Sequence, residues 1–278
     1  MGSIAAAFRF VPLSTRARIP YFLLAFIPMV LCCGVDSVTG APADEAVSAL
    51  ARHDWSTAER LANGLITESP NSPDGYRIRG LAENRLGKYP EALADFAAAL
   101  RIRPDDIESV LGRGRTHRLL KQYDAAVSDF TQAHEMARGQ ARPLCERGAI
   151  LILQGKYNAC LADYNAAEAL EPRYPGLLSY FAEVYLYMRR PADALAASKE
   201  GLQREPSLLI HRVNLAHSLL FLGRYDEAKA IYLGLQNDID EGKQITGAQV
   251  VRNDFAQMRA AGISHPDMAR IEVQLGTK

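Results

Sequence analysis

Between Thr39 and Gly242 the sequence repeats with a period of 34 residues, through six consecutive frames without an insertion. Counted from the start of each frame, positions 8 and 20 always hold a small residue. Position 8 is Ala46, Gly80, Gly114, Gly148, Ala182 and Ala216, and position 20 is Ala58, Ala92, Ala126, Cys160, Ala194 and Ala228. A period of this length indicates stacked helical hairpins, because one such unit cannot bury its own apolar face.

Larger residues keep the same register. Position 17 is Trp55, Tyr89, Tyr123, Tyr157, Pro191 and Tyr225, position 24 is aromatic at Phe96, Phe130, Tyr164 and Tyr232, and position 32 is Pro70, Pro104, Pro172 and Pro206. Small residues let two helices approach, an aromatic side chain fills the space to the next hairpin, and a proline ends the second helix. Ala62 and Ser198 replace the aromatic at position 24, which predicts looser joints at the first and fifth repeats.

This pattern resembles the tetratricopeptide repeat family over about three quarters of the chain. The resemblance implies an all-α fold, a right-handed α-solenoid of about six helix-turn-helix repeats with a concave groove. The frames start near residues 39, 73, 107, 141, 175 and 209, so we expect the repeat array over residues 44–242 and a helical cap over residues 243–278.

Position 7 is Arg79, Arg113 and Arg147 in the three central repeats, where position 23 is Asp95, Asp129 and Asp163. If positions 8 and 20 face each other in a hairpin, positions 7 and 23 lie close across the same seam. The sequence therefore predicts three ion pairs within repeats. Repeats five and six carry apolar pairs instead, Phe181 with Ala197 and Leu215 with Ile231, so that half of the array is more apolar.

The resemblance also implies that the groove is lined by the first helix of each repeat, at about positions 2, 5, 6, 9, 12 and 13. The candidate partner-binding residues are Arg77, Asn84, Arg85, Arg115, Arg118, Ile152, Tyr187, Asn214, His217 and Phe221. The earlier residues are basic and the later ones mostly apolar, which predicts a protein or peptide partner with acidic and apolar segments. The alternative is that the arginines form a solvated face, while the apolar residues pack against neighbouring hairpins or the tail.

Some family members hold a C-terminal carboxylate with a Lys and two Asn residues. The corresponding residues here are Arg77, Leu81 and Gly112, so that clamp is not carried over.

Residues 1–43 have the features of a secretory signal peptide. Arg9, Arg16 and Arg18 precede an apolar run from residue 19 to residue 35, and residues 41–43 read Ala-Pro-Ala. We expect the array to be periplasmic or secreted. Two alternatives stay open: an uncleaved inner-membrane anchor with the array outside the cytosol, and a lipoprotein acylated at Cys33.

The composition favours neither nucleic-acid binding nor catalysis. The net charge is zero, so no bulk electrostatic attraction recruits nucleic acid. The sequence holds no phosphate loop, nucleophile elbow or metal-ligand motif, and we expect no enzyme activity, cofactor or metal. Cys145 and Cys160 are expected to be core residues, because their predicted positions are about one helical turn out of register for a disulfide. A bond between them, which an oxidising compartment would permit, is the alternative.

The tail beyond the sixth frame keeps a helical pattern. Val250, Val251, Phe255 and Met258 are spaced for one face, and Gly262 follows as a stop. A second helix is predicted to begin around Ser264–Asp267 and to turn Met268, Ile271 and Leu275 inward. We interpret these helices as a cap on the sixth repeat, with docking of a partner helix as the alternative.

Taken together, these features predict an exported protein that binds other proteins or peptides as a scaffold, adaptor or assembly factor in the cell envelope. The alternative function is a stably membrane-anchored structural subunit of an envelope complex.

Overall fold

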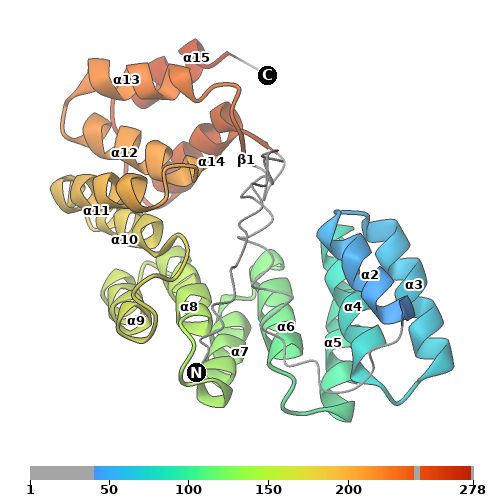
Figure 1. Ribbon diagram of the computed structural model, residues 1–278. Coiled ribbons are helices and arrows are strands. Elements are labelled where there is room, and N and C mark those ends of the chain that lie inside the picture. The colour runs from blue at the N-terminus through green and yellow to red at the C-terminus, as the bar shows by residue number, and fades with distance from the viewer. Residues whose placement is uncertain (1–40, 241–244, 277–278) are drawn as a thin grey trace, which may run out of the picture.

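The computed structural model describes residues 41–240 and 245–276. The predicted signal peptide lies outside the described residues, except that residues 41–43 begin the first described helix. Twelve of the fourteen described helices form six consecutive pairs, which follow one another along a curved path (Figure 1). The pairs are α2 (Ala41–Ala51) with α3 (Trp55–Glu68), α4 (Pro73–Arg85) with α5 (Tyr89–Ile102), α6 (Ile107–Leu119) with α7 (Tyr123–Met136), α8 (Arg142–Leu153) with α9 (Tyr157–Leu170), α10 (Leu177–Tyr187) with α11 (Pro191–Arg204), and α12 (Leu209–Phe221) with α13 (Tyr225–Gly234).

The predicted all-α solenoid is confirmed, and contacts of the small residues explain its period. A Cβ atom on Gly148 would lie 2.3 Å from the ring of Tyr164, and one on Gly80 would lie 3.1 Å from the ring of Phe96. Phe96 also reaches the next repeat, where a Cβ atom on Gly112 would lie 2.5 Å from its ring. The aromatic at position 24 thus packs within its own hairpin and against the following one, as the sequence predicted.

The turn inside each hairpin has a left-handed residue at frame position 15. Three repeats use glycine there, namely Gly87, Gly155 and Gly223, while His53, Lys121 and Arg189 adopt φ angles of 61°, 59° and 57°. This backbone region favours glycine because a side chain crowds the neighbouring carbonyl. The three non-glycine turns therefore carry a small conformational cost.

All three predicted ion pairs between positions 7 and 23 are present. The closest N–O distances are 2.6 Å for Arg79 with Asp95, 2.6 Å for Arg113 with Asp129, and 2.7 Å for Arg147 with Asp163. Two of these arginines also reach the preceding repeat. The Nη1 group of Arg79 donates to Asn63 Oδ1 at 2.7 Å, and that of Arg147 donates to Thr131 Oγ1 at 3.0 Å. The pairs therefore tie helices together within and between repeats.

The apolar core is unevenly distributed. The largest cluster of buried apolar residues runs from Ala141 to Leu275, whereas the clusters in the first three repeats are small and separate. Cys145 and Cys160 lie in the large cluster as free, buried thiols. Burial raises the pKa of Cys160 to about 12 and raises that of Cys145 as well. Both thiols are therefore held neutral as packing groups.

The C-terminal cap consists of α14 (Gly247–Ala260) and α15 (Met268–Gln274). The predicted inward residues are buried, namely Val250, Val251, Phe255, Met258, Met268, Ile271 and Leu275. A capping box between Thr246 and Gln249 starts α14. The second cap helix begins at Met268, later than predicted. A turn precedes it, in which the Met268 backbone N–H donates to the His265 carbonyl at 3.1 Å and the Asp267 backbone N–H donates to His265 Nδ1 at 3.2 Å.

Two short strands before α14 were not predicted. They are β1 (Ile239–Asp240) and β2 (Ile245–Thr246), paired antiparallel with Ile239 opposite Thr246. Within the described ranges, no helix is both long and apolar enough to cross a membrane.

Candidate partner-binding groove

The first helices of the second to sixth repeats supply the candidate groove residues, and in the second and third repeats Arg77 and Arg115 are already in ion pairs. Arg77 of α4 donates from Nη2 to Asp74 Oδ1 at 2.7 Å, and its Nε lies 3.7 Å from Asp106 Oδ2. Asp74 lies in the first turn of α4, and Asp106 is the residue that precedes α6. Arg77 therefore stabilises the helix start and the neighbouring turn in addition to any contact with a partner.

Two further ion pairs join α6 to α8. Arg115 donates from Nε to Glu146 Oε1 at 2.7 Å, and Arg142 donates to both oxygens of Glu108 at 2.6 and 2.9 Å. Burial favours the neutral form of Glu146, but the charges of Arg115 and Arg118 outweigh it and lower the pKa of this carboxyl. Glu146 is thus a carboxylate at neutral pH.

Arg85 and Arg118 differ from these arginines because their side chains are exposed. The Arg85 guanidinium lies 5.4 Å from the ring centroid of Trp55, within cation–π range. Partial burial and the charges of Arg115 and Arg118 lower the pKa of Arg85. The charges of these three guanidinium groups therefore interact, and we call Arg85, Arg115 and Arg118 the arginine cluster.

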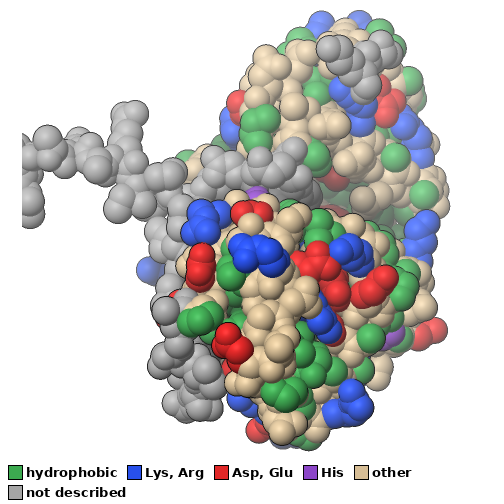
Figure 2. All heavy atoms as spheres, turned by 90° about the vertical axis from the view of Figure 1, so that its right-hand side faces the viewer, with side chains coloured by type: hydrophobic (Ala, Val, Ile, Leu, Met, Phe, Trp, Pro, Cys, Tyr) green, Lys and Arg blue, Asp and Glu red, His purple; other side chains and the backbone are tan. Residues whose placement is uncertain are grey.

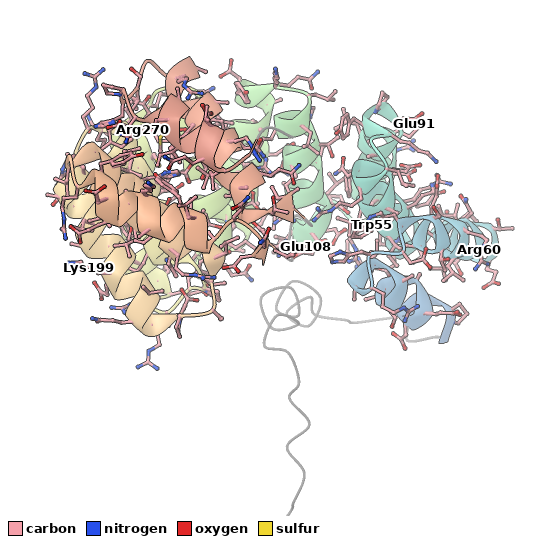
Figure 3. All side chains as sticks on the ribbon, turned by 90° about the horizontal axis from the view of Figure 1, so that it is seen from above. Trp55, Arg60, Glu91, Glu108, Lys199 and Arg270 are labelled. Atoms are coloured by element: carbon pink, nitrogen blue, oxygen red, sulfur yellow. The ribbon has the colours of Figure 1, made fainter. Side chains whose placement is uncertain are left out.

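Figure 3 places Trp55 and Glu108 toward the middle of the molecule, whereas Arg60, Glu91 and Lys199 lie at its outer edges. Trp55 was expected only as a repeat-pattern residue, and its contact with Arg85 was not predicted. Trp55 occupies frame position 17 of the first repeat, and Arg85 occupies position 13 of the second. Proximity of these two frame positions in neighbouring repeats could have indicated the contact between Trp55 and Arg85.

Exposed leucines continue this surface beyond the arginine cluster. Leu119 ends α6 with 45% exposure, and Leu153 ends α8 with 43%. Both occupy frame position 13, which Arg85 occupies in the second repeat. Asn84, one position earlier on α4, is half-buried. The exposed candidates of the second and third repeats are thus guanidinium groups, and two leucines at frame position 13 are also accessible.

Four of the later candidates are buried. The exposed fractions are 4% for Ile152, 6% for Tyr187, 4% for Asn214 and zero for His217. Asn214 donates from Nδ2 to the Ser179 carbonyl at 3.1 Å. These side chains therefore pack inside the array, which is the alternative that the sequence left open.

His217 shows how the cap closes this end of the array. Its Nδ1 lies 2.7 Å from the Tyr232 hydroxyl, and its Nε2 lies 3.3 Å from Asp254 Oδ2 on α14. Its ring also lies 5.2 Å from that of Phe255. Phe221, the last candidate, is half-buried and makes an edge contact with His265 at 5.8 Å between ring centroids. The cap thus contacts two of the later candidates, His217 and Phe221.

No group of His, Cys, Asp and Glu side chains suited to a metal ion occurs in the part of the chain that the structure describes. The groove is accordingly characterised by ion pairs, guanidinium groups and apolar side chains.

Family models of the tetratricopeptide repeat match residues 43–107 and residues 212–234. No curated protein matches the sequence. Among solved structures, a thermophilic tetratricopeptide repeat protein of Thermus thermophilus is 25% identical, with a TM-score of 0.57 over 64% of this chain and 97% of that one. A tetratricopeptide repeat protein of Parabacteroides merdae is 14% identical, with a TM-score of 0.58 over 86% of this chain and all of that one.

A larger assembly component shows the same fold. The Cut9–Hcn1 complex of the APC/C is 16% identical, with a TM-score of 0.65 over 91% of this chain and 52% of the matched chain. At this identity the likeness concerns the fold alone.

Proposed function

Because the chain is a tetratricopeptide repeat protein, we propose that it binds a protein or peptide partner as a scaffold, adaptor or assembly factor in the cell envelope. The repeats and the repeat proteins of similar structure suggest a protein-binding scaffold. The family and fold are typically non-enzymatic, which supports a binding role over catalysis.

The observation that carries this proposal is a set of exposed basic and apolar side chains on the first helices of the second to fourth repeats. Arg85 and Arg118 are exposed there, and Leu119 and Leu153 are exposed at the ends of α6 and α8. Guanidinium groups bind carboxylates through paired N–H donors, and accessible leucines gain free energy when a partner removes them from water. This surface fits a partner segment with acidic residues near the arginine cluster and apolar residues near the two leucines.

The rest of the surface does not favour a partner by bulk charge. Figure 2 shows acidic and basic side chains interspersed over the face that it presents. The net charge is zero, so long-range steering of a polyanion is weak. A partner would then be selected by local contacts in the groove.

Export to the cell envelope is supported by the sequence of residues 1–43. The alternative is a stably membrane-anchored structural subunit, in which the apolar run is retained. Mass spectrometry of the protein from its native cells separates the two: loss of about 43 residues supports the soluble adaptor, and an intact N-terminus supports the anchored subunit.

The binding proposal is tested by affinity capture from a cell-envelope fraction with the double variant Arg85→Glu/Arg118→Glu. The matched control is Arg60→Glu/Lys199→Glu, which changes the charge equally at exposed positions on the outer edges (Figure 3). We expect partners to be lost with the groove variant and retained with the control. Equal capture by both variants would contradict a groove site.

A further inference from the structure

Three carboxylates and two cations lie together where the second repeat contacts the first. Arg79 of α4 donates to both oxygens of Asp95 on α5, at 2.6 and 2.7 Å. Lys88, in the turn before α5, donates to both oxygens of Glu59 on α3, at 2.6 and 2.9 Å. Each cation thus has a carboxylate of its own, and Glu83 of α4 is the third carboxylate.

Glu83 is buried without a cation to match it. Its side chain is 8% exposed, and its Oε1 lies 3.9 Å from Arg79 Nε, which is beyond hydrogen-bond range. The remaining nitrogen of Arg79, Nη1, donates to Asn63 Oδ1 at 2.7 Å. Among residues 41–240 and 245–276, no ion pair joins Glu83 to α2, α3, α5 or α6, and no hydrogen-bond donor reaches its Oε2. An ionised Glu83 therefore leaves an unbalanced negative charge in a buried site, which is costly.

A proton on Glu83 removes this imbalance. It leaves two carboxylates for two cations, and the carboxyl O–H can donate to Asp95, whereas two carboxylates can only accept. Burial, followed by the charge of Asp95, raises the pKa of Glu83 to about 7, although the charge of Arg79 opposes the shift. The buried carboxyl therefore changes its charge near neutral pH.

Of the three seams that contain an Arg–Asp pair, only that of the second repeat has a further carboxylate at frame position 11. This position is His117 in the third repeat and Leu151 in the fourth. His117 Nε2 lies 3.8 Å from Asp129 Oδ2, and Leu151 is buried and uncharged. The excess negative charge is thus a property of the second repeat.

The first repeat is held against Glu83 by few contacts. The two clusters of buried apolar residues that join it to α4 each contain one residue of α4, Ile78 or Ala82. Its polar links to the second repeat include the hydrogen bond from Arg79 and the ion pair of Lys88. The α4–α5 hairpin, in contrast, is closed by the buried ring of Phe96. Repulsion around Glu83 is therefore relieved more readily between α3 and α4 than between α4 and α5.

We propose that the proton on Glu83 holds the first repeat closed against the second, and that its loss to solvent favours opening of α2 and α3 away from α4. The ionised carboxylate repels Asp95 and Glu59, and it gains hydration when the contact between α3 and α4 opens to water. Opening restores an ordinary pKa of about 4.5. The opening equilibrium constant therefore rises with pH between about 4.5 and 7 and levels off above that range.

Hydrogen exchange of the full chain at pH 5 and pH 8 tests this switch. Protection factors are compared, because they correct for the pH dependence of intrinsic exchange. We expect protection in α3 to fall at least about tenfold at pH 8, and protection in α9 to change less. Glu83→Gln, which is neutral at both pH values, should abolish the fall in α3, and so should Glu83→Leu, which copies the fourth repeat. Glu91→Gln is the matched control, since it removes an exposed carboxylate from the same hairpin.

Trp55 supplies a second readout, because it is the single tryptophan of the sequence and lies on α3, 5.4 Å from the Arg85 guanidinium. Acrylamide should quench its fluorescence more strongly at pH 8 than at pH 5, and Glu83→Gln should remove the difference. His53 stacks on Trp55 at 5.0 Å, and a histidine can change its own protonation in this range. Quenching is therefore measured in a His53→Asn background, since asparagine tolerates the φ angle of 61°.

Two results would overturn the proposal. One is a fall of protection in α3 no larger than that in α9. The other is a fall in α3 that persists in Glu83→Gln, or that Glu91→Gln abolishes equally.

Discussion

The two halves of the array stack their repeats in different ways. In the second to fourth repeats, partly exposed Arg–Asp pairs join the two helices of each hairpin, and further ion pairs cross between α6 and α8. In the fifth and sixth repeats the same seam is apolar, and one large core continues into the cap. The first half thus leaves basic and apolar side chains of its first helices exposed, whereas in the second half the cap packs against His217 and Phe221.

Because of this difference, we expect the two halves to differ in their stability and in their availability to a partner. A buried apolar interface stabilises more per residue than a partly exposed ion pair, which contributes about 0–1 kcal/mol. The C-terminal half is therefore expected to be the more stable, and the N-terminal half the more available to a partner.

The largest expected loss of stability follows from truncating a buried side chain in the apolar, C-terminal half. Phe255 is fully buried between His217 and Tyr232, so Phe255→Ala should cost about 3–5 kcal/mol of unfolding free energy. Hydrogen exchange should accelerate in α12–α15 and change little in α4–α7, because repeats contact mainly their neighbours. Val273→Ala is the control, since that side chain is 71% exposed. Equal acceleration throughout the array would show that the halves do not differ in this way.

A second prediction concerns replacing the Arg–Asp pair of the third repeat with the Phe–Ala pair of the fifth repeat. Asp129→Ala leaves the Arg113 guanidinium without its main carboxylate and should cost about 1–3 kcal/mol in urea denaturation. Arg113→Phe/Asp129→Ala reproduces the pair found in the fifth repeat and should cost less than the single change. A larger loss in the double variant would mean that the third repeat cannot accept the apolar seam.

A third prediction concerns pH and the charged half. Glu83 is buried beside Arg79 and Asp95, and burial, followed by the charge of Asp95, raises its pKa from 4.5 to about 7. The folded state therefore holds this proton more tightly than the unfolded state. The resulting stabilisation is complete below pH 4.5 and is lost as the pH rises through about 7.

Glu83→Gln should remove this dependence, because glutamine stays neutral at all pH values. We expect the variant to exceed the unmodified protein in stability by about 1–3 kcal/mol at about pH 8, and the gain to shrink toward pH 4.5. Urea denaturation at the two pH values measures it. A difference independent of pH would exclude the elevated pKa.

The smallest effect on stability is expected for the exposed arginines. Arg85→Glu/Arg118→Glu should lower the unfolding free energy by about 1–2 kcal/mol, from loss of the Arg85–Trp55 contact and of the Arg118 charge that favours ionised Glu146. Arg77→Glu/Arg115→Glu should cost several times more, because reversal places two like charges beside Asp74 and Glu146. Thermal denaturation of the two double variants compares their losses of stability. Equal losses would show that exposed and ion-paired arginines contribute equally to stability.

The sequence predicted the elements that depend on the 34-residue register. Small residues such as Gly148, aromatics such as Phe96 and the Arg–Asp pairs all follow from positions within one hairpin or between adjacent ones. The inward face of the cap was also predictable, because Phe255 and its neighbours follow helical spacing.

The groove was predicted less completely, since its accessibility depends on contacts between repeats. Glu108 and Arg142 occupy the same position in consecutive frames, and this 34-residue spacing could have indicated their ion pair. The burial of His217 could not be derived in the same way. It depends on the angle at which α14 meets the array, which no pattern in the tail specifies.

The most direct test of the account is hydrogen exchange of the array with and without a partner captured from the envelope. Binding to the open half predicts protection in α4 and α6 and at the end of α8, with protection lost in the Arg85→Glu/Arg118→Glu variant. Protection absent from α4 and α6 but present on α12–α15 would contradict the account, because it would place the binding surface on the half that we regard as closed by its own cap.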